Sequence, residues 1–192
     1  MMVLLPLRTN TITVTSMAML AALGIVMRLF VRIPIVPGML ELSPGFLFSE
    51  LGGVIGGLIG GAVVGAIVGI GGAIAGGEVP LMPLIGNVFL GIGTGYAIHI
   101  TSDRNSAKYI LLVILGGGLI GGFVPDMTVF LALSESLGAA LLAAVLDALQ
   151  GAAWAAAALM VEKLVVRPIL GQYLYVYPMA LSIEDHEGDP ND

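Results

Sequence analysis

The sequence predicts an all-α integral membrane protein, a bundle of six transmembrane helices in which the second and third are short and rich in glycine. Of its 192 residues, 58% are hydrophobic and only 10% are charged. The mean hydropathy is +1.05, far above that of soluble globular domains. The charges avoid long segments of the chain, and 12 of the 27 residues from Leu51 to Gly77 are glycine. Together these observations indicate a packed membrane bundle.

The glycine-rich stretch reads LGGVIGGLIGGAVVGAIVGIGGAIAGG, and many of its glycines recur at every fourth position. In the interior of a helix in water, glycine costs about 1 kcal/mol relative to alanine. In hydrocarbon a helix keeps its backbone hydrogen bonds, because nothing else there can satisfy those groups. Small residues spaced by four then form a flat surface on which a neighbouring helix packs closely. The stretch therefore predicts tight helix packing inside a membrane.

A helix needs about 20 apolar residues to cross a bilayer. On this basis the expected spans are residues 12–30, 45–60, 61–77, 84–101, 108–131 and 139–161. The 33 residues from 45 to 77 would form a single helix about 50 Å long, whereas the hydrocarbon layer is about 30 Å thick. We therefore expect two compact spans that turn near Gly60 and Gly61, with one long span as the alternative.

The positions of the basic residues favour this topology. If the N-terminus lies in the cytoplasm, five of them fall on the cytoplasmic side: Arg8, Arg104, Lys108, Lys163 and Arg167. Only Arg28 and Arg32 fall outside. The distribution follows the positive-inside rule, so both termini are expected to be cytoplasmic. Residues 1–180 are expected to form a single transmembrane domain, followed by an acidic, disordered tail at 181–192.

Ionisable residues inside membrane spans are costly and usually face a cavity or a partner, so they are the first candidates for a binding site. Asp147 lies about nine residues into the last span, roughly 14 Å deep and near the midplane. Gln150 and Trp154 follow at i+3 and i+7 on the same helix face. A carboxylate, an amide and an indole on one stripe are suited to hold a polar aromatic or cationic small molecule. The alternative is that Asp147 only joins neighbouring helices.

Further polar residues are expected in the outer half of the six-span bundle. They are Arg28 at the end of the first span, Glu50 near the start of the second, Asn87 in the fourth, Asp126 in the fifth and Glu135 in the loop that follows. Each could instead act as a helix cap or a packing polar group, and Arg28 as an interfacial side chain. Because acidic residues outnumber basic ones here, the set favours a neutral or cationic ligand over an anion.

The chain lacks the motifs of the common enzyme classes. It has no cysteine and only two histidines, His99 and His186, too few for a histidine–cysteine metal cluster. It has no G-x-x-x-x-G-K-[ST] phosphate-binding loop and no serine–histidine arrangement typical of a hydrolase. We therefore expect no enzymatic activity, no metal or cofactor, and no nucleic-acid partner.

Four features occur in order over most of residues 10–165. The first span has an A-x-x-x-A pattern at Ala18 and Ala22, followed by LGIVMRLF. A proline-containing outer loop ends in ELSPGFLFSELGG, the glycine-punctuated hairpin GGLIGGAVVGAIVGIGG comes next, and the last span has a polar face. In this order and spacing the chain resembles an S component of an energy-coupling factor (ECF) transporter, the small substrate-capturing subunit of vitamin importers.

The resemblance implies a mechanism. An S component binds a vitamin or a similar micronutrient at its outer side, in the cell membrane of a prokaryote. It then associates with a membrane coupling subunit and two cytoplasmic ATPase subunits, which release the substrate inside. By the resemblance, Ala18 and Ala22 would contact the coupling subunit. The Asp147-x-x-Gln150 spacing is similar to the D-x-x-K of biotin-specific members, with glutamine in place of the lysine, and a thiamine-like or aminomethyl-heterocycle substrate fits the acidic residues better than biotin does.

Two other classes of membrane protein remain open. One is a small autonomous transporter or channel, for which an internal repeat of the first three spans in the last three would be expected. The sequence has no such repeat beyond shared glycine richness. The other is a membrane scaffold without a ligand, in which the buried acidic residues only join helices.

Overall fold

The computed structural model describes residues 6–176 except 32, 37–39, 78–80 and 135. Within these residues, five helices are long and apolar enough to cross a membrane: Thr11–Phe30, Gly45–Gly76, Leu81–Ile100, Ala107–Thr128 and Leu137–Leu174. The predicted class, a helical protein with several membrane-type helices, is therefore confirmed. The tail at 181–192 and Glu135 lie outside the described residues.

Helix α1 (Thr11–Phe30) coincides with the first predicted span. Its N-terminus is capped by Asn10, whose side-chain oxygen accepts a hydrogen bond from the backbone N–H of Thr13 at 2.8 Å. The buried face of the helix carries Thr13, Ala21 and Gly24, and the small residues among them let α2 approach closely.

A small antiparallel sheet interrupts the helical fold after α1. Strands β1 (Ile33–Val36) and β2 (Leu40–Leu42) pair with Ile33 opposite Leu42, and the register shifts between Pro34 and Val36. The sheet lies in the proline-containing loop predicted between the first two spans, and the all-helical class of the chain is unchanged. The physical basis of the sheet is the IPIV sequence of β1, because β-branched residues favour strands and proline disfavours helix interiors.

Helix α2 (Gly45–Gly76) is broken at Gly57, whose φ of 66° and ψ of −158° are not helical. A Cβ atom added at Gly52 would lie 2.7 Å from the Cβ of Val64. On an unbroken helix these two residues would be about 18 Å apart. The chain therefore folds back on itself, and we call residues 45–56 the first arm and 58–76 the second arm. The turn lies at Gly57, three residues before the predicted Gly60–Gly61.

Glycine occurs at this turn and at the helix contacts for two different reasons. At Gly57 the left-handed φ is accessible to glycine at little cost and to other residues only with strain. At the contacts, glycine is needed because backbones touch: Gly61 and Gly91 meet so closely that a Cβ on either one would collide with the carbonyl group of the other. Gly91 belongs to α3 (Leu81–Gly95), which runs against both arms of α2.

The remaining segments form two composite helices joined by short turns. The first of them contains α5 (Ala107–Leu115), the π-helical segment η1 (Gly116–Phe123) and α6 (Val124–Thr128). The second contains α7 (Leu137–Val161), the π-helical η3 (Glu162–Val166) and α8 (Arg167–Leu174). The short α4 (Ala97–Ile100) follows α3, and the 3₁₀ turn η2 (Leu131–Leu133) precedes α7. The last helix thus continues 13 residues beyond its predicted end at 161.

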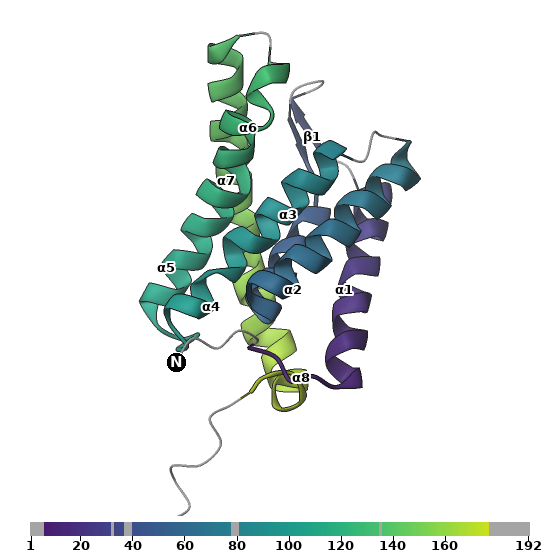
Figure 1. The fold of residues 1–192 in the computed structure, drawn as a ribbon, viewed down its shortest axis with the longest axis vertical. Helices are drawn as coiled ribbons and strands as arrows, with labels where there is room; N and C mark the ends of the chain where they lie inside the picture. Colours follow the sequence, from purple (N-terminus) through teal and green to yellow (C-terminus); the bar gives the residue numbers. More distant parts are fainter. Residues whose placement is uncertain (1–5, 32, 37–39, 78–80, 135, 177–192) are drawn as a thin grey trace, which may run out of the picture.

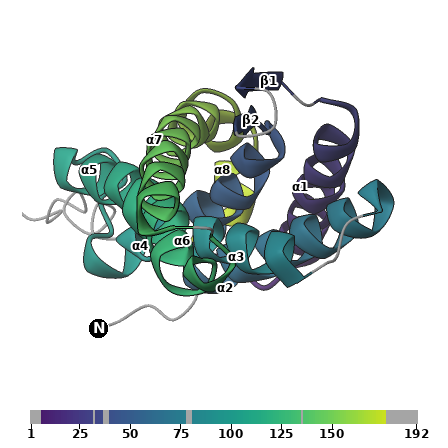
Figure 2. The same ribbon diagram turned by 90° about the horizontal axis from the view of Figure 1, so that it is seen from above.

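Figure 1 shows how these helices are arranged along the bundle. The two strands and α6 lie at one end, which we call the strand end, and α8 lies at the other. Residues from both ends of the described chain meet beside α8: the backbone N–H of Arg8 donates to the carbonyl oxygen of Leu174 at 2.8 Å. We call this the terminal end. Seen from above in Figure 2, α2 and α3 lie between α1 on one side and α5 and α7 on the other.

Candidate binding site between the helices

Two of the predicted site residues, Asp126 and Asp147, come together near the strand end. Asp126 projects from α6 and Asp147 from α7, and their carboxyl groups lie close enough to interact directly. Both line a small cavity of about 40 Å³, whose other walls include Phe46, Leu90 and Phe130. Two carboxyl groups in contact share a proton or hold a cation between them, since two bare negative charges repel strongly at this distance.

Glu50 lies deeper, on the first arm of α2. Its side chain is fully buried, and neither carboxyl oxygen has a hydrogen-bond partner among the described residues. A Cβ added at Gly117 in η1 would lie 3.2 Å from its Oε1 and 2.7 Å from the Cβ of Ala155 in α7. The carboxyl group is thus enclosed between the first arm, η1 and α7. A buried carboxyl group without a partner is costly, so this position calls for a proton or a cationic ligand.

The three acidic residues lie at two different depths in the bundle, which can be measured along α7. Asp147 is one helical turn before Gly151, and Gly151 and Ala155 both contact Gly117 beside Glu50. Glu50 is therefore roughly 6–12 Å farther from the strand end than Asp147. Leu90 lines the cavity of Asp126 and Asp147, which we call the upper cavity, and packs against Gly121 of η1 and Gly151 of α7. Its side chain therefore lies between this cavity and the level of Glu50. We call Glu50, Asp126 and Asp147 the acidic seam.

Gln150 and Trp154 occupy the α7 face that the sequence predicted. Gln150 is buried, and Trp154 is half-buried with its indole Nε1 enclosed and without a partner among the described residues. Both lie between the levels of Asp147 and Ala155 along the helix. The stripe of carboxylate, amide and indole therefore faces the interior of the bundle.

Asn87 is placed beside the seam, but its own hydrogen bonds are satisfied. Its Oδ1 accepts from the Ser49 hydroxyl at 2.8 Å and its Nδ2 donates to the carbonyl oxygen of Pro83 at 2.8 Å. The bond from Ser49 ties α3 to the first arm of α2, and the bond to Pro83 lies within α3. Asn87 therefore helps to position the first arm at Ser49, the residue directly before Glu50.

Arg28 lies apart from the seam. Its side chain packs over Gly45 and Gly72, on the α1 side of α2, and it does not line the cavity of Asp126 and Asp147. The structure therefore does not bring this predicted site residue together with the others. Ala18 and Ala22, predicted as a contact for a coupling subunit, are both exposed on α1.

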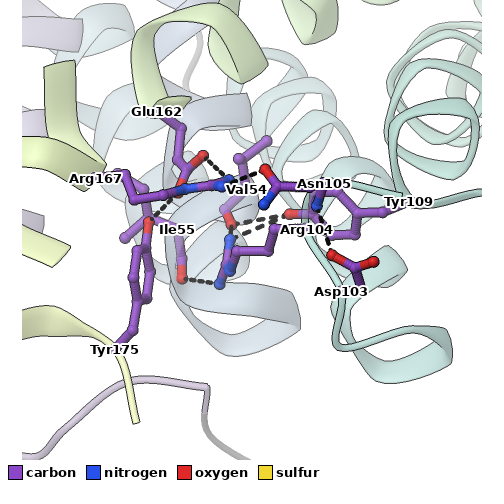
Figure 3. Close-up of polar contacts among 9 residues, drawn as sticks. All are labelled: Val54, Ile55, Asp103, Arg104, Asn105, Tyr109, Glu162, Arg167 and Tyr175. Carbon is purple, nitrogen blue, oxygen red and sulfur yellow. Dashed lines mark hydrogen bonds and ion pairs between the residues drawn. The ribbon is translucent and has the colours of Figure 1, made fainter. Parts of the chain in front are cut away.

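A second polar network, at the terminal end, was not identified from the sequence (Figure 3). The break at Gly57 leaves the last carbonyl groups of the first arm without helical donors. The guanidinium group of Arg104 replaces those donors: Nη1 donates to the carbonyl oxygen of Val54, and Nη2 to that of Ile55 at 3.2 Å. Inside a membrane protein such a break persists only where side chains satisfy it in this way.

The same network holds the end of α7 and the segment after α8 in place. Glu162 is fully buried and accepts from Arg167 at 2.6 and 3.0 Å and from the Tyr175 hydroxyl at 2.7 Å. The Tyr175 ring lies under Arg104, with the guanidinium carbon 4.3 Å from the ring centre. Burial raises the pKa of Tyr175 far above its ordinary value, so its hydroxyl stays protonated and donates to Glu162.

Only a weak signal in the sequence pointed to this network. Arg104 and Arg167 were predicted only as basic residues on the cytoplasmic side, and no role was predicted for Glu162, which follows the last expected span at 139–161. Their partners are backbone carbonyl groups and residues more than 40 positions away in some cases, such as Ile55 for Arg104. Periodicity cannot predict such pairs.

The geometry limits what the site can hold in this conformation. Pockets for small molecules usually measure about 300–1,000 Å³, so a cavity of about 40 Å³ admits a water molecule or a small ion but no vitamin. A larger ligand requires the first arm, α6 and α7 to separate. Among the described residues there is no group of three or more His, Asp or Glu side chains arranged to hold a metal ion. Comparison of the chain with protein-family models gives no match, and comparison with curated proteins gives none either.

Proposed function

We propose that this chain is the substrate-capturing subunit, the S component, of an ECF-type importer for a vitamin or a related micronutrient. The observation that carries the proposal is the acidic seam. It places three carboxyl groups inside an apolar helix bundle, on the side away from the terminal-end network. Ionisable side chains in that setting usually mark the path or the binding site of a small molecule.

The topology that supports this function has six membrane crossings. If the two arms of α2 each cross, the chain starts and ends on the same side, and the terminal end with Arg8, Arg104 and Arg167 faces the cytoplasm. The acidic seam then opens toward the outside of the cell membrane of a prokaryote. The first arm, with 12 residues or about 18 Å, is short for a crossing, which is consistent with a compact glycine-rich hairpin.

The charge of the seam favours a substrate that is cationic or neutral. The described walls of the upper cavity offer two carboxyl groups and no basic side chain. A substrate with a positively charged ring or aminomethyl group would therefore be bound better than a dicarboxylate. Transport would require the membrane coupling subunit and two ATPase subunits, with exposed Ala18 and Ala22 as the contact surface on α1.

A scaffold without a ligand is the second candidate, and the size of the cavity favours it. If the seam only joins helices, about 40 Å³ is all the space that it needs. Native mass spectrometry of the purified protein, followed by uptake assays with a coupling module, distinguishes the two. A co-purified small molecule whose uptake depends on this chain supports the importer. A ligand-free protein that promotes no uptake of any tested vitamin contradicts it.

A further inference from the structure

A large cavity lies away from the acidic seam, between α1 and the second arm of α2. It is an open groove of about 820 Å³ at the terminal end. The two helices are in close contact toward the strand end, where a Cβ at Gly24 would lie 2.5 Å from Val68. Toward the terminal end they separate, and the α1 atom nearest to Gly60 is the Met17 sulfur, 3.8 Å from a Cβ placed there. Figure 1 shows the two helices diverging in this direction.

The groove is apolar along its length and polar at one end. Its apolar walls are formed by Val14, Met17, Val63 and Ile67. From Ile59 to Ile67 the second arm rises about 12 Å, which is most of one membrane leaflet of about 15 Å. A groove of this length and polarity matches a lipid chain whose headgroup lies at the terminal end.

The polar end of the groove carries groups that attract an anion. Arg8 lines it, and its described hydrogen bond, from Nε to the carbonyl oxygen of Tyr175 at 3.0 Å, leaves the terminal nitrogens for a ligand. The N-terminus of α1, a helix of 20 residues, adds its positive partial charge. Thr13 is 92% buried in the groove wall, and its hydroxyl has no hydrogen-bond partner among the described residues.

We propose that this groove binds one anionic phospholipid of the leaflet at the terminal end. The phosphate lies between Arg8 and the N-terminus of α1, where the hydroxyl groups of Thr11 and Thr13 can donate to it, and an acyl chain fills the groove between α1 and the second arm. Basic pockets between transmembrane helices recognise anionic headgroups in this way. A zwitterionic lipid such as phosphatidylcholine has the same chain and phosphate, but it also carries a choline cation that Arg8 repels. The proposal goes beyond the transport function and needs neither a substrate nor a coupling subunit.

The test uses the full chain, purified in detergent and supplied with equal amounts of phosphatidylglycerol and phosphatidylcholine. Native mass spectrometry measures which lipid is retained. We expect the unaltered protein to retain phosphatidylglycerol at least tenfold better than phosphatidylcholine. Arg8→Gln should remove this preference, whereas Lys108→Gln, an exposed basic residue in the first turn of α5, should leave it unchanged.

A second variant separates lipid binding from any effect of Arg8 on folding. Val63 is 49% exposed in the groove, so Val63→Trp should fill the groove, lower the retention of both lipids several-fold and leave the melting temperature unaltered. Leu141→Trp, on an exposed position of α7, is the matched control. Equal retention of the two lipids by the unaltered protein would overturn the proposal. Unchanged lipid retention in Val63→Trp, together with loss of binding to a coupling subunit, would assign the groove to a protein helix instead.

Discussion

Arg104 donates through Nη2 to the carbonyl oxygen of Ile55 at 3.2 Å and thereby caps a helix from which it is separated by 49 residues. The same guanidinium group contacts the carbonyl oxygen of Val54 and stacks on the ring of Tyr175. One side chain thus satisfies the end of the first arm and joins it to the last described residues of the chain. The break in α2 and the closure of the terminal end are therefore parts of a single arrangement.

The first prediction follows from this contact. Arg104→Gln should lower the free energy of unfolding by about 3 kcal/mol, because hydrogen bonds from a charged donor to two buried carbonyl groups are lost. Arg104→Lys should recover only part of this stability. An ammonium group cannot donate to two carbonyl groups and stack on an aromatic ring with the geometry of a guanidinium group. Melting curves in detergent measure both. A loss no larger than that of Lys108→Gln would show that the cap does not contribute.

The turn itself depends on Gly57. Gly57→Ala should destabilise the protein by about 2 kcal/mol, because φ is 66° and a Cβ would lie 3.0 Å from the His99 ring. Gly77 is a control with a similar φ of 72° and a ψ of 21°, and no atom of the described residues lies within 4 Å of the added Cβ. Gly77→Ala therefore carries only the backbone strain, about 1 kcal/mol. Equal losses at the two positions would mean that neither the packing around Gly57 nor its ψ of −158° adds to the cost.

The sequence predicted the helical segments better than it predicted their breaks and contacts. Apolar length alone locates a span, so the first span was placed to within one residue of α1. The break in α2 was placed three residues late, because Gly57, Gly60 and Gly61 look alike in sequence and only tertiary contacts select one of them. The sheet at Ile33–Val36 was missed because short strands between helices lack a periodic signal.

The candidate site was predicted in part, for a similar reason. The acidic residues were recognisable because carboxyl groups are rare inside apolar segments, and α7 places Asp147, Gln150 and Trp154 on one face by its period alone. That Asp126 contacts Asp147, while Glu50 lies a level deeper behind Leu90, depends on how glycines let the helices approach. This approach is a property of the packed bundle and is absent from any single helix.

The proposed topology makes the next prediction. The chain has no cysteine, so single introduced cysteines are labelled without background. Leu58→Cys, directly after the turn, should react with a membrane-impermeant maleimide from the cytoplasmic side, and Ala75→Cys, near the end of the second arm, from the outside. Ser106→Cys provides an internal reference for the cytoplasmic side. If residue 58 is unreactive from both sides and residue 75 is labelled from the cytoplasmic side, the region 45–77 is a single long span.

Ala22→Leu tests the proposed contact with a coupling subunit. Ala22 is exposed on α1 and does not line the lipid groove, so added bulk should leave folding and ligand binding unchanged. It should reduce uptake at least tenfold, because small residues are what let a partner helix approach. Ala18→Leu should also reduce uptake, but Ala18 lines the groove proposed to hold the lipid, so its lipid retention is measured as well. Met19→Leu, a volume-conserving change at an exposed position, should leave uptake unchanged. Equal loss of binding and uptake would place these alanines in the ligand site instead.

The last prediction concerns the acidic seam. If Asp147 holds a cationic group of the substrate, Asp147→Asn should weaken binding by about 2 kcal/mol, roughly thirtyfold, because a charge-assisted hydrogen bond is lost. Glu50→Gln should have a similar effect if the substrate reaches the deeper level. Folding should survive both changes, since an amide keeps the shape of the carboxyl group and removes a charge that is costly in hydrocarbon. Titration with the co-purified ligand and melting curves measure the two quantities.

A scaffold role predicts the opposite pattern. If the contact between Asp126 and Asp147 only joins α6 to α7, Asp147→Asn changes the melting temperature and leaves affinity nearly unchanged. Trp154→Ala sharpens the distinction, because its indole lies two turns along the same face and contributes to affinity only if that face lines the ligand. Asn87→Ala is the structural reference: it removes the hydrogen bond from Ser49 that holds α3 against the first arm, so it should lower stability whichever role is correct. If Asp147→Asn and Trp154→Ala both bind the ligand with normal affinity and melt at lower temperatures, α7 does not contribute to the binding site.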